Sequence, residues 1–151
     1  MFVEDWKGYI KNKRDSYKKM KPISCPAFDN EKIYFNRYGF DHIVYKDGIP
    51  RPQGEVVKRF KLLEYVPNIL GKVQTLSSGE KRTRGNSTAY FWAIQHKVGN
   101  LISVRFIIRR LNNGHLHFFS IMLELHRTSQ RRFCEILAIN YSVESNLLRF
   151  P

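Results

Sequence analysis

The sequence is poor in cysteine, and it lacks long apolar runs and the short motifs of the common enzyme classes. Its 151 residues include two cysteines, Cys25 and Cys134, too few for a disulfide framework or a cysteine zinc site. No window approaches the roughly 18 apolar residues of a transmembrane helix. Metalloprotease, P-loop and serine-hydrolase motifs are absent. We therefore expect chemistry by ordinary side chains, with no metal or other cofactor, in a reducing cytoplasm.

Acidic residues are also scarce relative to basic ones. The chain has 26 Lys and Arg against 13 Asp and Glu, a net charge of +13, and residues 35–110 alone carry +9. A small domain this basic most often binds a polyanion, and nucleic acid is the first candidate. An anionic membrane surface is the weaker alternative, and we expect no membrane partner. A nucleic-acid site should be built mainly from residues 35–110.

Apolar residues in the first half of the chain recur at helical spacing. The pattern predicts helices over residues 3–20 and 53–66, and Pro67 is suited to begin one further turn that Gly71 ends. Between the two helices, the segment RYGFDHIVYK (37–46) is too short for periodicity to separate helix from strand.

The second half of the chain changes to period-2 alternation, which is typical of strands. Three β-rich runs predict an antiparallel meander, over residues 88–98, 101–110 and 115–123. Asn112-Asn113-Gly114 joins the last two runs as a hairpin. Before them, the polar, glycine-rich segment 77–87 predicts an exposed loop. Helices followed by strands indicate an α+β fold.

Alternation along the middle run separates an apolar face from a face that carries Arg105 and Arg109. If the hairpin turn has two residues, Ile107 lies opposite Ser120, so Ser120 joins the arginine face and His117 falls on the apolar face. A three-residue loop would swap this assignment. The two arginines either line a phosphate track or belong to an ordinary solvated strand face.

His42 is the histidine whose surroundings best suit acid–base chemistry. It lies in the ambiguous segment, close in sequence to Arg37, Lys46 and Arg51. An imidazole with a near-neutral pKa among cations is suited to proton transfer on a phosphodiester. The alternative is a histidine with only a structural role.

Three stretches of the chain resemble the barnase–EndoU–colicin–RelE-like (BECR) nuclease superfamily, most closely its phage-associated branches: YFNRYGFDHIVYKDGIPRPQGEVVKRFKLLEYVPNIL, YFWAIQ and VRFIIRRLNNGHLHFFSIM. The resemblance covers about residues 32–123, which would form a nuclease-like core. Residues 1–31 would then be a helix-and-loop appendage, and residues 124–151 an extension packed on the core. The implied fold is two N-terminal helices followed by a curved antiparallel sheet.

The resemblance also implies metal-independent RNA cleavage, often as a toxin, with an acidic immunity or antitoxin protein as partner. Its sites typically combine a histidine from the helical part, basic residues on the sheet and a Ser or Thr in a late strand. Here His42 matches the first, Arg105 or Arg109 the second and Ser120 the third. The glutamate of barnase-type members has no evident counterpart on this sheet face.

The first interpretation is therefore an endoribonuclease in which the ribose 2′-OH attacks the adjacent phosphorus and leaves a 2′,3′-cyclic phosphate. His42 would act as general base or acid, Arg109 would stabilise the developing charge with Arg105, and Ser120 would bind the phosphate. Further substrate-binding candidates are the basic residues Arg37, Lys46, Lys58 and Arg59, with Tyr90 or Trp92 stacking on a base. The alternatives are a non-catalytic nucleic-acid-binding module and a small phage structural or interaction protein. The sequence does not distinguish tRNA, mRNA and rRNA as substrates.

Overall fold

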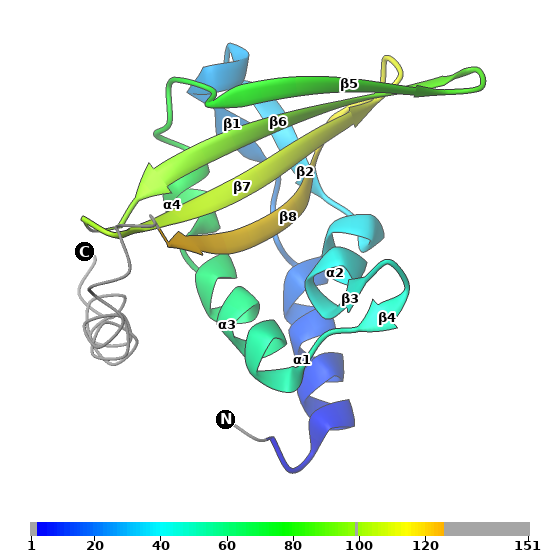
Figure 1. Ribbon diagram of the computed structural model, residues 1–151, viewed down its shortest axis with the longest axis vertical. Coiled ribbons are helices and arrows are strands. Elements are labelled where there is room, and N and C mark those ends of the chain that lie inside the picture. Colours follow the sequence, from blue (N-terminus) through cyan, green and yellow to red (C-terminus); the bar gives the residue numbers. More distant parts are fainter. Residues whose placement is uncertain (1–2, 99, 126–151) are drawn as a thin grey trace.

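The computed structural model of the protein describes residues 3–98 and 100–125, in which helices cover one face of a six-stranded sheet (Figure 1). The helices are α1 (Trp6–Lys18), α2 (Arg37–Val44), α3 (Gln53–Leu63) and α4 (Val66–Leu70), with a short 3₁₀ helix at Pro26–Phe28. The strands are β1 (Ile23–Cys25), β2 (Glu31–Phe35), β3 (Tyr45–Lys46), β4 (Ile49–Pro50), β5 (Ser78–Arg84), β6 (Ser87–Lys97), β7 (Ile102–Leu111) and β8 (Leu116–Leu125). Most of the predicted C-terminal extension, residues 126–151, lies outside the described residues.

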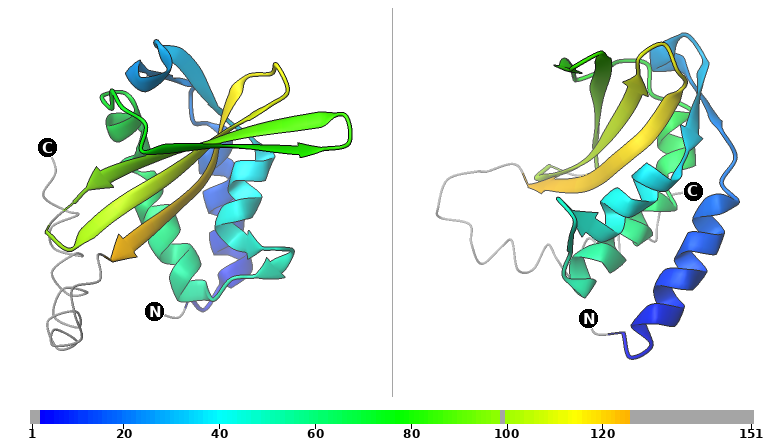
Figure 2. Two further views of the ribbon diagram at one scale, coloured as in Figure 1. Left: turned by 45° about the horizontal axis from the view of Figure 1, so that its top comes forward. Right: turned by 90° about the vertical axis from the view of Figure 1, so that its right-hand side faces the viewer.

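The large sheet has the order β1-β2-β8-β7-β6-β5, and it curves across the helices (Figure 2). Its strands pair antiparallel except for β2 and β8, which are parallel. The predicted meander is confirmed as β6-β7-β8, and the α+β class with it. β3 and β4 form a separate two-stranded hairpin.

Side-chain caps mark the first residues of α1 and α2. The Asp5 carboxylate accepts a hydrogen bond from the Gly8 N–H (2.9 Å) at the start of α1, and Asn36 caps α2 in the same way. The ambiguous segment 37–46 therefore forms α2 followed by β3. The helix predicted over 53–66 is α3, and the further turn at Pro67 is α4. In the described part of the chain, no helix combines the length and apolarity needed to span a bilayer.

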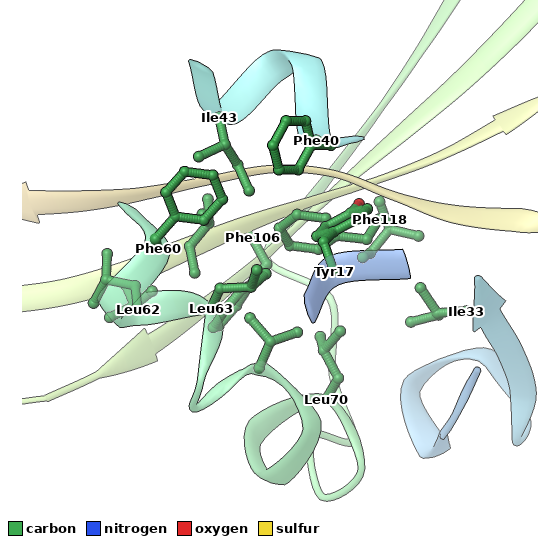
Figure 3. Packing of buried hydrophobic residues seen from close by; sticks show 14 of the residues in the cluster. Tyr17, Ile33, Phe40, Ile43, Phe60, Leu62, Leu63, Leu70, Phe106 and Phe118 are labelled. Carbon is green, nitrogen blue, oxygen red and sulfur yellow. The ribbon is translucent and has the colours of Figure 1, made fainter. Parts of the chain in front are cut away.

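The hydrophobic core fills the space between the helices and the sheet (Figure 3). Phe60 of α3, Phe106 of β7 and Phe118 of β8 are almost completely buried there. Residues 1–31, expected as an appendage, also contribute: Tyr17 of α1 and Cys25 of β1 belong to the same core.

The loop predicted over 77–87 is wrong, because most of it is a strand. β5 pairs with β6 along its whole length, from Ser78 opposite Ala93 to Arg84 opposite Ser87. Every residue of β5 is exposed, and β5 is an edge strand of the sheet. A strand that buries neither face lacks the apolar alternation that identifies strands, and its basic residues are typical of a protected edge.

The register of the β7–β8 hairpin differs from the two-residue-turn prediction close to the turn. Arg109 lies opposite His117, whereas Ile107 lies opposite Ser120, so β8 contains one extra residue at Phe119. This β-bulge restores the predicted register for the rest of the strand. The prediction that Ser120 lies on the same face as Arg105 is therefore confirmed. The prediction that His117 lies on the apolar face is wrong, since it lies opposite Arg109 and shares its face, and Phe119 also contacts Arg109 on that side.

α2 lies directly against β8, which brings His42 to the edge of the sheet. β2 pairs only with the first three residues of β8, and the chain then leaves the sheet and forms α2 beside the remainder of that strand. A Cβ at Gly39 would lie 2.4 Å from the backbone oxygen of Phe118. Only glycine permits this close approach of helix and strand.

Candidate functional site

A cleft of about 300 Å³ lies on the sheet face that carries Arg105 and Ser120, which we call the arginine face. β5, β6, β7 and β8 form its floor and one wall, and α2 with the β3–β4 hairpin forms the other wall. His42, Lys46 and Arg51 line it from the helical side, while Arg105 and Ser120 line it from the sheet. Four predicted site residues are thus brought together at one cleft: His42, Lys46, Arg105 and Ser120.

His42 projects from α2 onto the Phe119 ring, with 4.0 Å between the ring centroids. The imidazole is partly buried, and burial lowers its pKa below the usual histidine value. The nearby cations Arg51, Arg59 and Arg109 lower the pKa further, against an opposing effect of Asp47. His42 is therefore neutral at pH 7 and able to accept a proton.

Arg109 is held by aromatic rings and not by a carboxylate. Its guanidinium lies 5.1 Å from the centroid of the Tyr38 ring and 5.0 Å from that of Phe119. Its Nε is buried without a hydrogen-bond partner, and Arg109 makes no ion pair within the described residues. Arg109 lies beside the cleft, because it contacts the same Phe119 ring as His42. Its charge is therefore available to an anionic ligand.

Arg105 differs from Arg109 because it is already paired. Its Nη1 donates to Glu124 Oε1 (3.0 Å), and Gln95 Nε2 donates to the other oxygen of the same carboxylate (2.7 Å). Glu124 offsets much of the charge that Arg105 brings to the cleft. This glutamate also places an acidic side chain on the arginine face, where the sequence showed no evident counterpart of the barnase-type glutamate.

Ser120 is 5 % exposed, and it reaches the cleft because the bulge at Phe119 places both residues on the same side of β8. Its hydroxyl makes no hydrogen bond within the described residues. The hydroxyl is therefore free to donate to a ligand in the cleft.

Of the remaining predicted substrate-binding residues, Arg59 has a different environment from the one expected. Arg59 is 8 % exposed, its Nη1 donates to the Ile121 carbonyl (2.6 Å), and its Nε and Nη2 donate to Glu55. It is a buried structural residue that acts on the site only through the pKa of His42. Lys58 is exposed on α3 and does not line the cleft. Arg37 is exposed on α2, in an ion pair with Asp41.

The sequence placed Arg51 near His42 but did not give its contacts, and it did not identify the two aromatic residues of the cleft. Arg51 lies against α2, where its Nε donates to the His42 carbonyl (3.2 Å) and its Nη1 to Glu55. Phe91 and Phe119 form the aromatic part of the cleft, with 5.3 Å between their centroids. The register of β6 against β7 was the missing signal for Phe91, which lies opposite Arg109.

The two aromatic residues considered as base-stacking candidates have other neighbours. Trp92 packs edge-on against Phe28, and Tyr90 stacks on Trp92, so both contribute to packing on β6. Phe91, between them in sequence, faces Phe119. Phe91 is therefore the β6 ring best placed to meet a base.

No three His, Cys, Asp or Glu side chains within residues 3–98 and 100–125 are grouped so that they could hold a metal ion. The arrangement can bind an anion with Arg109, accept a proton with His42 and donate a hydrogen bond from Ser120. Comparison of the chain with models of protein families, with curated proteins and with solved structures finds no match.

Proposed function

We propose that the protein is an endoribonuclease that cleaves RNA without a metal ion. The observation that carries this proposal is a partly buried imidazole with a lowered pKa at a basic cleft, next to an arginine that no carboxylate of the described residues neutralises. Burial alone lowers the pKa of a histidine, and here three nearby arginines lower it further. A general base for a phosphodiester does need to be neutral and close to cations that stabilise the transition state.

In the proposed reaction, His42 takes the proton from the ribose 2′-OH as O2′ attacks the adjacent phosphorus. The O2′–P bond forms and the P–O5′ bond breaks, which leaves a 2′,3′-cyclic phosphate. Water supplies a proton to O5′, and His42 returns its proton to solvent. Arg109 stabilises the charge on the non-bridging oxygens, Ser120 donates a hydrogen bond to one of them, and Arg105 assists as a weaker, carboxylate-paired cation.

The fold is compatible with this function. Helices packed on one face of a curved, mostly antiparallel sheet resemble the layout implied for BECR nucleases, with the difference that β1 and β2 lie between α1 and α2 in the chain. We propose that the chain is a toxin-like member of that superfamily. Such an activity in the cytoplasm would require an inhibitor. An acidic immunity or antitoxin protein would complement the net charge of +13.

The test is cleavage of purified RNA in EDTA, followed by identification of the fragment ends. The wild type is expected to yield 2′,3′-cyclic phosphates and to leave a 2′-deoxy oligonucleotide of the same sequence intact. His42→Ala is expected to lower the rate about 10²–10⁴-fold, the usual cost of losing a general base. His96→Ala is the matched control, because His96 lies on β6 and does not line the cleft.

The same experiment identifies the alternative, a non-catalytic nucleic-acid-binding module. One observation favours it: the β5–β6 hairpin extends exposed basic residues beyond the helices (Figure 1). A binding module would bind RNA with a strong salt dependence, would leave it intact, and would bind equally well as His42→Ala. Equal cleavage rates for wild type and His42→Ala would also overturn the proposed mechanism.

A further inference from the structure

Three hollows lie next to one another, because each shares lining residues with the next, and we call the three together the path. The cleft meets a middle hollow of about 520 Å³ at His42 and Asp47. The middle hollow meets a third, of about 380 Å³, at Arg14 and Tyr45. The third hollow lies between α1 and the β3–β4 hairpin. The path therefore runs from the arginine face, past α2, to the first helix.

The α1 end of this path carries uncompensated positive charge. Lys7, Lys11 and Arg14 line the third hollow, are exposed, and make no ion pair within the described residues. Their spacing places them on one side of the helix, about 6 and 4.5 Å apart along its axis. No carboxylate lines this hollow among residues 3–98 and 100–125. In contrast, Lys13, on another side of α1, pairs with Glu64 at 3.8 Å.

The middle hollow combines aromatic rings and carboxylates with Arg14, which it shares with the third hollow. Tyr38 is 63 % exposed and Tyr45 is 38 % exposed, which is unusual for such large rings. Asp41 is paired with Arg37, and Asp47 makes no ion pair within the described residues. Tyrosine rings stack on nucleobases, and a carboxylate accepts hydrogen bonds from base amino groups but repels phosphate. This part of the path is suited to bases.

We propose that the path binds one strand of RNA several nucleotides long, with bases in the middle hollow and backbone phosphates on Lys7, Lys11 and Arg14. The position of the reacting phosphate in the cleft rests on the proposed ribonuclease function. A groove that combines cations with stacking rings is the usual arrangement of single-strand binders. An acidic protein would match the α1 cations but not the exposed tyrosines and Asp47. The site therefore selects unpaired RNA longer than a dinucleotide.

The direct test measures binding of a fluorescent, uncleavable 2′-O-methyl RNA of about twelve nucleotides, within the range of single-strand binding sites. The double variant Lys7→Gln/Lys11→Gln should bind roughly 20-fold more weakly at about 0.1 M salt, with a salt slope shallower by about 1.4, because two phosphate contacts are lost. The matched control Lys19→Gln/Lys72→Gln removes the same charge from exposed positions outside the three hollows. It should bind as the wild type does.

The second measurement compares kcat/KM for a cleavable RNA of the same length with kcat/KM for a dinucleotide. The wild type should prefer the longer RNA, and the α1 double variant should lose most of that preference. If the wild type cleaves neither substrate but the double variant still loses affinity, the nuclease proposal fails while the RNA path stands. If the double variant binds like its control, the path is overturned, and an acidic protein becomes the better occupant of the α1 face.

Discussion

The two faces of β7 and β8 are built on different principles. On the helix side, Phe106 and Phe118 are completely buried in an apolar core. On the arginine face, Arg109 Nε and His117 Nδ1 are buried without hydrogen-bond partners. Unsatisfied buried polar groups cost stability. On the helix side the Tyr17 hydroxyl is also buried without a hydrogen-bond partner, so the faces differ mainly in the charged side chains that the arginine face carries. The apolar face forms the core of the fold, and the arginine face carries the groups of the proposed site.

Arg59 and Arg109 show the same contrast in a single residue type. Arg59 is held by Glu55 and by the Ile121 carbonyl, so its hydrogen-bonding groups are used within the protein. Arg109 has two aromatic rings as neighbours and no carboxylate among the described residues. Rings orient a guanidinium without neutralising it. An arginine held in this way keeps its charge for a partner outside the chain.

The largest expected effect is a difference in the free energy of unfolding between variants of Phe118 and Phe119, two neighbouring residues on opposite faces of β8. Phe118→Ala should lower the free energy of unfolding by about 3–5 kcal/mol, because it leaves a cavity in the core. Phe119→Ala should cost clearly less stability, since its ring is only partly buried, yet it should weaken RNA cleavage by releasing His42 and Arg109. Urea unfolding and cleavage assays on both variants provide the measurement. Equal losses of stability would contradict the division into two faces.

The next effect compares the two arginines of the arginine face. Arg109→Met should lower kcat for RNA cleavage about 10²–10³-fold, as expected for loss of a group that stabilises transition-state charge. Arg105→Met should have a smaller effect, because Glu124 already offsets the charge of Arg105. Steady-state kinetics on a single oligonucleotide gives both values. A larger loss for Arg105→Met would assign the phosphate contact to the paired arginine instead.

The smallest effect concerns pH. Because burial and nearby cations lower the pKa of His42, the acid limb of the kcat/KM profile should fall below the usual histidine value of about 6.5. Arg51→Met removes one of these cations, so it should raise the pKa of His42 and move the acid limb to higher pH. NMR titration of the His42 ring should show the same direction. An unmoved acid limb in Arg51→Met would contradict His42 as the base.

The same pKa shifts determine the sign of the stability change with pH. Folding lowers the pKa of both His42 and His117, so below about pH 6.5 the unfolded chain binds more protons than the folded chain. The contribution of these histidines therefore destabilises the fold as the pH falls through this range. Their contribution should be absent above about pH 7, where both histidines are neutral in both states.

Elements were predicted correctly from the sequence where the apolar periodicity of a segment comes from one buried side. The helical periodicity of residues 3–20 and the alternation of 101–110 reflect a single buried side, and both elements formed as expected. Prediction failed at β5, because an edge strand with both faces in solvent has no apolar alternation. At the site, residue type and strand parity singled out His42 and Ser120 as candidates, and sequence proximity placed Arg51 near His42. The sequence did not contain the hydrogen bonds of Arg51 to the His42 carbonyl and Glu55.

The sequence by itself determined the α+β class, the β6-β7-β8 meander and the basic surface, because periodicity and charge are local properties of the chain. Only the tertiary structure decided which cations remain available: Glu55 engages Arg59, Glu124 engages Arg105, and Arg109 has no such partner among the described residues. It also decided the face of His117, through the bulge at Phe119. Pairing and register depend on contacts between residues far apart in the chain, and the patterns of single segments do not contain them.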